Sequence, residues 1–197
     1  ELEKAVRENG AVRENGTVNA VLNVAGDFVV NSGTFESNSA ASVKLNLKGA
    51  TGVYKYNDAT TLLKNLTVDI VGNYALQSPV VSDNLTVETG ILTLGNNSLT
   101  VNGATTVTGS SNGITKSVDV NAGTLTTGSI SINSGNGSKI AQVTISSGII
   151  NCAGDLLFSG NSANARLIFT GGGTLNIGGN LGTTGTLTPS TGTINYN

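Results

Sequence analysis

Apolar and small polar residues alternate along most of the chain, beginning after Gly16. In VLNVAGDFVVNSG (21–33) and IINCAGDLLFSG (149–160), a single Asn lies between two apolar residues before the A-G-D corner, and further apolar residues follow it. Such alternation is typical of β-strands with one buried face. Turn-forming pairs such as Gly154-Asp155 lie between the alternating segments. The sequence therefore predicts short strands joined by tight corners over residues 17–197.

The alternating segments recur as internal repeats, with weaker copies at TLNIGGNLGTTG (174–185) and ILTLGNNSLTVNG (91–103). Glycines that open successive copies are 33, 25, 25 and 19 residues apart: Gly90, Gly123, Gly148, Gly173 and Gly192. Each copy holds three segments in which inward, outward and inward positions alternate. Alignment of the second segment predicts one inward core stack, formed by Val24, Leu94, Cys152 and Ile177. Their outward neighbours would be Asn23, Thr93, Asn151 and Asn176.

Three short strands and three corners in about 25 residues make one coil of a β-solenoid, in which stacked coils bury a continuous core. With strands about 4.8 Å apart, residues 17–197 would form a parallel β-helix of roughly seven coils. An antiparallel β-sandwich is the alternative, since it also has short strands with regular turn signals. A sandwich does not, however, predict a repeat in which all three strands keep their order.

The first 16 residues, ELEKAVRENGAVRENG, differ from the rest and carry seven of the 22 charged residues. The hexapeptide AVRENG occurs there twice in tandem. Residues 1–8 contain good helix formers, and a solenoid end exposes strand edges that proteins usually cover. Residues 1–16 are therefore expected to form either an N-terminal cap or a flexible leader, separate from the repeat domain at 17–197.

Composition excludes several functional classes. Charged residues make up 11 % of the chain, and the formal net charge is −2. This balance provides no basic surface for nucleic acid or anionic membranes. The chain has no His and a single Cys, so zinc sites built on these residues and internal disulfides are not expected. No apolar run reaches the length of a membrane span, and no cofactor is expected.

Candidate catalytic residues are sparse, and no enzyme activity is expected. Asp27 and Asp155 occupy the same A-G-D corner, where Asp ordinarily binds its own turn backbone. The glycine cluster at 171–173 is followed by neither the Asp of a calcium repeat nor the Lys of a phosphate loop. Cys152 replaces an apolar residue of its repeat and is expected to be buried rather than nucleophilic. No metal site is predicted.

Polar residues suggest two further arrangements. The Thr-x-Thr pairs at 124–126, 184–188 and 191–193 could order water on a flat face, but the repeat alignment places them at different coil positions. No continuous two-column array is therefore expected. Asn23, Asn151 and Asn176 share an outward position in the alignment, and stacked Asn side chains can form amide ladders. A partial ladder is predicted.

The segments GTLNIGGNLGTTGTLTPSTGTINYN (173–197) and YNDATTLLKNLTVDIVG (56–72) resemble the β-strand repeats of large secreted bacterial surface proteins. These include adhesin-like and autotransporter-passenger-like chains, particularly those of Bacteroidetes-type bacteria. The resemblance covers residues 17–197 and implies a solenoid-like fold, an extracellular or cell-surface location and a structural or adhesive role.

The expected function is that of an extracellular structural protein, a rod or filament-forming module of a surface adhesin or fibre. The alternative is a glycan- or ice-binding surface module. GTINYN (192–197) matches GVYKYN (52–57), after which the earlier copy continues into another strand. The chain is therefore expected to be either a fragment of a longer solenoid or a subunit that joins other copies head to tail. The predicted assembly residues are Val18, Ala20, Leu22, Thr193, Ile194 and Tyr196.

Overall fold

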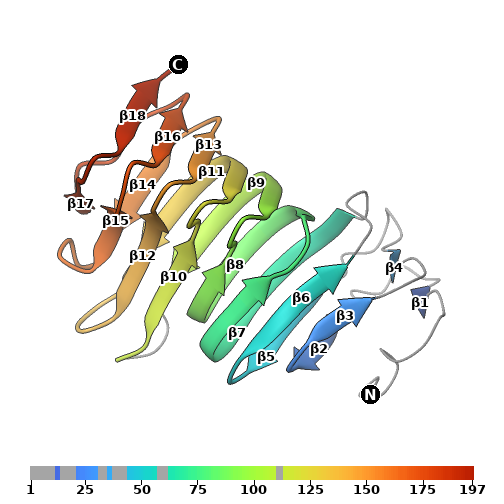
Figure 1. Cartoon of the computed structure of the whole chain (residues 1–197). Helices are drawn as coiled ribbons and strands as arrows, with labels where there is room; N and C mark the ends of the chain where they lie inside the picture. The colour runs from blue at the N-terminus through green and yellow to red at the C-terminus, as the bar shows by residue number, and fades with distance from the viewer. Residues whose placement is uncertain (1–11, 14–20, 31–34, 37–43, 57–61, 110–112) are drawn as a thin grey trace.

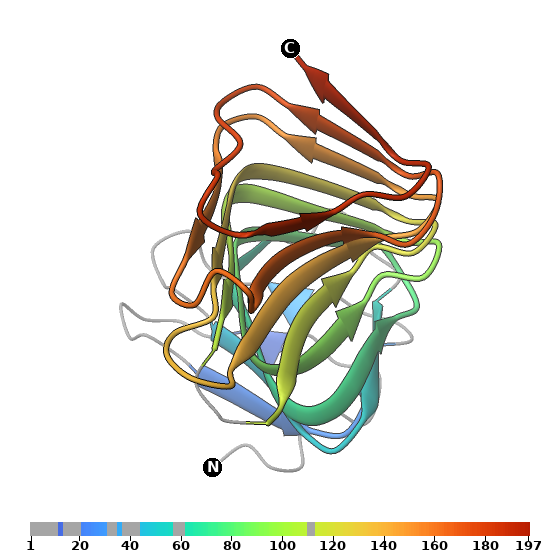
Figure 2. The same ribbon diagram turned by 90° about the vertical axis from the view of Figure 1, so that its left-hand side faces the viewer.

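A computed structural model describes residues 12–13, 21–30, 35–36, 44–56, 62–109 and 113–197. The chain is an all-β solenoid of about six turns, which confirms the predicted fold and comes close to the expected seven coils. All pairings between the named strands are parallel, so the antiparallel sandwich does not form. Successive turns stack from the N-terminal to the C-terminal end (Figure 1) and enclose a common interior when seen from the side (Figure 2).

The chain forms strands of 2 to 15 residues. Their bounds are β1 Val12–Arg13, β2 Val21–Ala25, β3 Phe28–Val30, β4 Phe35–Glu36, β5 Lys44–Gly49, β6 Gly52–Tyr56, β7 Leu62–Leu76, β8 Val80–Thr93, β9 Ser98–Thr108, β10 Thr115–Asp119, β11 Thr124–Asn133, β12 Ile140–Ile145, β13 Ile149–Cys152, β14 Leu156–Ser159, β15 Ala165–Phe169, β16 Thr174–Ile177, β17 Thr186–Thr188 and β18 Thr193–Tyr196.

The strands build three faces around the interior. The first face contains β2, β5, the middle of β7 and β8, the ends of β9 and β11, and β14. The second face contains β3, β6, the ends of β7 and β8, then β10, β12, β15 and β17. The third face contains the starts of β8, β9 and β11, followed by β13, β16 and β18.

Inward side chains form columns of similar residues along the axis. On the second face, Leu92, Val118, Val143 and Leu167 pair in successive turns, and all four are fully buried. No turn could bury its apolar side chains alone, because each turn is a single layer of backbone. Stacking removes these side chains from water at about 25 cal/mol per Å² of apolar surface.

The strand register corrects the predicted alignment of the repeats. Val24 pairs with Leu47 on the first face, and Leu94 follows the second-face pair Thr93–Asp119. Cys152 pairs with Ile177 on the third face. Leu94, Cys152 and Ile177 are buried and Val24 is half-buried against the same core, but the four residues occupy three columns rather than one.

The alignment was wrong in the N-terminal half because the turns differ in length. The separation of paired residues in successive turns ranges from 18, for Asn73 and Ile91, to 26, for Ile130 and Leu156. The pairings of β7 with β8 and of β8 with β9 also contain register shifts. Each irregularity changes the number of residues between equivalent positions in successive turns. The last three copies have more even turns, and there Ile150/Cys152 does stack on Leu175/Ile177 as predicted.

Most of the charged N-terminal segment lies outside the described residues. Only Val12 and Arg13 are described, and they pair in parallel with Phe35 and Glu36 in a separate two-stranded sheet. The cap or leader role of residues 1–16 stays a prediction.

A buried tyrosine connects turns that are not neighbours. The Tyr74 hydroxyl accepts a hydrogen bond from the Phe28 backbone N–H and donates one to the Gly26 carbonyl, both at 2.9 Å. Burial raises the pKa of this hydroxyl well above its usual value. Gly52 pairs with Tyr74 in the intervening turn, and a Cβ there would lie 2.6 Å from the tyrosine ring. Because Gly52 has no side chain, the Tyr74 ring fits beside it and reaches Gly26 and Phe28.

Replacing Tyr74 with Phe is expected to lower the free energy of unfolding by about 1–3 kcal/mol, because the Phe28 N–H and the Gly26 carbonyl each lose their partner. Urea unfolding followed by circular dichroism would measure this. Tyr196→Phe is the matched control, since Tyr196 is 66 % exposed. Equal stability of the two variants would show that the Tyr74 hydroxyl does not hold the turns together.

Candidate functional site

The third face carries a regular set of outward polar side chains on β9, β11, β13, β16 and β18, which follow one another in Figure 1. Their pairings contain no register shift on this face. Each strand contributes two outward residues, all polar except Ile149, on either side of an inward apolar one. We name these residues the polar array: Ser98 and Thr100, Thr124 and Thr126, Ile149 and Asn151, Thr174 and Asn176, and Thr193 and Asn195.

The Thr-x-Thr pairs lie at different coil positions, as the repeat alignment predicts, and the two columns of the polar array instead mix Ser, Thr, Asn and Ile. Thr124 and Thr126 share their coil position with four other pairs, whereas Thr186 and Thr188 lie on the second face in β17. The Thr-x-Thr pattern alone does not indicate the array, because three of the five array pairs contain Asn. The signal that would have found it is the segment after each corner: SLTV (98–101), TLTT (124–127), IINC (149–152), TLNI (174–177) and TINY (193–196).

Stacked glycines occupy the corner that directly precedes the strands of the polar array. The Gly148 carbonyl accepts a hydrogen bond from the Thr174 N–H at 2.9 Å. In the same way, the Gly123 carbonyl accepts from the Ile149 N–H at 3.0 Å and the Gly173 carbonyl from the Thr193 N–H at 2.9 Å. A Cβ on Gly148 would lie 2.4 Å from the Gly123 carbonyl oxygen. Only glycine therefore lets these corners stack at strand spacing. Gly90, which the repeat alignment grouped with this column, instead pairs with Lys116.

The second residues of the five array pairs form one column, and its last three members are the stacked amides Asn151, Asn176 and Asn195. The Asn176 Nδ2 donates to the Asn151 Oδ1 at 2.8 Å, and the Asn195 Nδ2 donates to the Asn176 Oδ1 at 2.8 Å. The predicted ladder is therefore correct for Asn151 and Asn176. Asn23 was wrongly placed in it, because Asn23 accepts from Asn46 at 2.9 Å on the first face. The ladder fixes the orientation of its amides and leaves each with further hydrogen-bonding capacity.

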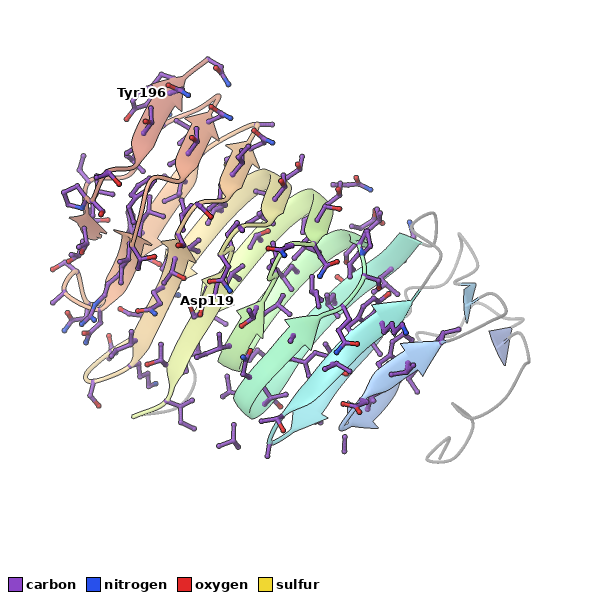
Figure 3. All side chains as sticks on the ribbon, in the orientation of Figure 1. Asp119 and Tyr196 are labelled. Carbon is purple, nitrogen blue, oxygen red and sulfur yellow. The ribbon has the colours of Figure 1, made fainter. Side chains whose placement is uncertain are left out.

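Charged groups lie away from the polar array. Lys64 and Asp83 form an ion pair at 2.8 Å, and the hydrogen bond from Lys64 lowers the pKa of the Asp83 carboxyl. On the second face, Asp119 accepts hydrogen bonds from Ser117 and, at 2.8 Å, from Thr144 (Figure 3). The sequence from 167 to 197 contains no charged residue. The array is consequently an uncharged surface on a protein that carries its charges elsewhere.

Groups for chemical catalysis do not gather in the described part of the chain. It contains no cluster of three His, Cys, Asp or Glu side chains. Cys152 is 3 % exposed, donates to the Gly154 carbonyl at 3.4 Å, and has its thiol pKa raised by burial. The corner carboxylates bind backbone: Asp27 accepts from the Val53 N–H at 3.0 Å and Asp155 from the Asn180 N–H at 2.7 Å.

The predicted assembly residues divide between the two ends. Val18 and Ala20 lie outside the described residues, and Leu22 is half-buried in β2. Thr193 is exposed, Ile194 is half-buried and Tyr196 is 66 % exposed in β18, which forms the last strand at the C-terminal end (Figures 1 and 3). Among the described assembly residues, Leu22 therefore lies in the first strand of the main stack, and Thr193, Ile194 and Tyr196 lie in the last.

The C-terminal end presents one uncovered layer of inward positions. Leu187 pairs with Leu167, Ile194 with Leu175, and Tyr196 with Ile177. The earlier residues of these pairs are fully buried, whereas Leu187 is 40 % exposed. Among the described residues, β17 and β18 each pair with another strand on one side only. We name Leu187, Ile194 and Tyr196 the C-terminal layer.

Comparison with protein families, curated proteins and solved structures finds no match to this chain. In the described ranges, no helix is both long and apolar enough to cross a membrane.

Proposed function

We propose that this protein is an extracellular structural module, a rod of a bacterial surface protein or fibre whose copies join head to tail. The uncovered C-terminal layer carries the proposal, because apolar side chains and unpaired strand edges occur there together. The uninterrupted core supports a rod-like role, since its inward columns run through successive turns. The resemblance of the repeats to secreted surface proteins supports the proposed location.

Strand addition explains how one copy would extend another. An unpaired edge presents backbone N–H and C=O groups that another parallel strand can satisfy. At the opposite end of the described stack, β2 and β3 also pair on one side only, and Leu22, Val24 and Val30 are half-buried. Joining these unlike ends continues the core columns across the junction. A heterologous contact that does not close produces a filament.

We expect the double variant Leu187→Lys/Ile194→Lys to abolish assembly, because it places two charges in the layer that a second copy would bury. Light scattering over a concentration series and negative-stain electron microscopy would compare it with the unaltered chain. Unaltered protein is expected to form elongated particles that lengthen with concentration.

Val71→Lys is the matched control, because Val71 is 71 % exposed in β7, which has β5 and β6 on one side and β8 on the other. It should assemble like the unaltered chain. Assembly of the double variant to the same length would disprove head-to-tail joining. The proposed location is tested separately by antibody labelling of intact and permeabilised bacterial cells, and labelling confined to permeabilised cells would contradict it.

A further inference from the structure

The polar array has the geometry of a two-dimensional lattice. Neighbouring strands of a sheet are about 4.8 Å apart, and successive outward residues on one strand are about 6.6 Å apart. Five strands in continuous register therefore repeat the same pair of outward positions over about 19 Å along the axis. A ligand that matches one pair meets an equivalent pair at each further strand.

The array side chains are also held in fixed positions. Thr and Ile are β-branched, so they have few χ1 rotamers. The hydrogen bonds that Asn176 and Asn195 donate along the ladder orient the amides. The buried columns behind the array, which include Leu125, Ile150 and Leu175, fix the backbone. Binding to such a surface costs little side-chain entropy, which allows many weak contacts to add up.

The three faces differ in the chemistry that they present. The outward residues of the second face include Asp119 and Arg166, and those of the first face include Lys48 and Asp69. Charged groups impose their own hydration shells. The array instead presents hydroxyl, amide and methyl groups, with Ile149 40 % exposed among them. An uncharged surface that repeats hydroxyl and amide groups in register fits a partner that is itself a regular lattice of hydrogen-bonding groups.

We propose that the polar array binds the surface of ice, holding a layer of lattice-ordered water through its hydroxyl and amide groups. Its spacings are on the scale of the oxygen lattice of ice, and its groups both donate and accept hydrogen bonds. Carbohydrate recognition commonly uses aromatic rings against sugar faces, and no array residue is aromatic. This function goes beyond the rod module and does not depend on head-to-tail assembly.

Thr126→Lys and Thr174→Lys test the array. Each places a long charged side chain in one column of the lattice without altering a buried residue. Capture of the protein by a slowly growing ice surface and inhibition of ice recrystallisation are the measurements. The unaltered chain should be enriched in ice, whereas each variant should fall to the level of serum albumin.

Thr106→Lys is the matched control, because Thr106 is an outward threonine of β9 that lies on the first face and outside the polar array. It should bind ice as the unaltered chain does. Circular dichroism and thermal unfolding of all variants separate loss of binding from loss of fold. Exclusion of the unaltered chain from ice would overturn the proposal. Equal capture of Thr126→Lys and Thr106→Lys, or binding to insoluble cellulose or chitin without binding to ice, would also overturn it.

Discussion

Replacing Ile150 with Asp is expected to unfold the solenoid, lowering the free energy of unfolding by more than about 4 kcal/mol. Ile150 is fully buried between Leu125 and Leu175 in the third-face column. The substitution removes apolar packing in three consecutive turns and places a carboxyl group where it finds no water. Because each turn is stabilised by its neighbours, damage in this turn weakens both adjoining interfaces.

Ile149→Asp is the control, one residue away. Ile149 is 40 % exposed in the polar array, so the same change of side chain leaves the carboxylate in water and should cost less than about 1 kcal/mol. Urea unfolding of the two variants, followed by circular dichroism, measures the difference. A strand register shifted by one residue would exchange the two outcomes. Greater damage from Ile149→Asp would therefore disprove the inward direction of the column.

The sequence was sufficient to predict the fold class, because the solenoid depends on local alternation and on a repeat. The stacking of Cys152 on Ile177 was predicted correctly, since one regular turn separates the two residues. The alignment failed for Leu22/Val24 and Leu92/Leu94, which belong to other faces. All three faces use the same in–out–in pattern, so a short segment does not reveal its face.

Most of the polar array was missed for the same reason. Its members are small polar residues, which are common throughout the chain, and only the register decides which of them share a surface. Asn23 and Asn151 lie within similar short sequences, VLNV and IINC. Asn23 is nevertheless on the first face and Asn151 on the third. The hydrogen bond between Tyr74 and the Phe28 N–H joins residues 46 positions apart, and no pattern in the chain indicates it.

The glycine column should be as important to the third face as the apolar columns, and Gly148→Ala is the direct test. The added Cβ would lie 2.4 Å from the Gly123 carbonyl oxygen and 2.8 Å from that of Asn121. Both are backbone atoms, so the corner must move apart to admit it. That movement also disturbs the hydrogen bonds at 2.6 Å from the Gly148 N–H to Asn121 and at 3.0 Å from the Ile149 N–H to Gly123. We expect a loss of about 1–3 kcal/mol in the free energy of unfolding.

Gly172→Ala makes the same chemical change at a corner with room for it. The nearest atom to its added Cβ is the Thr191 Oγ1 at 3.7 Å, an ordinary contact. At an unstrained site, Ala reduces the entropy of the unfolded chain relative to Gly, so this variant should equal or exceed the unaltered protein in stability. Urea unfolding of both variants gives the comparison. If Gly148→Ala proved as stable as Gly172→Ala, the corner at Gly148 would have space for a Cβ. The close approach of Gly148 to Gly123 would then not be what aligns the strands of the polar array.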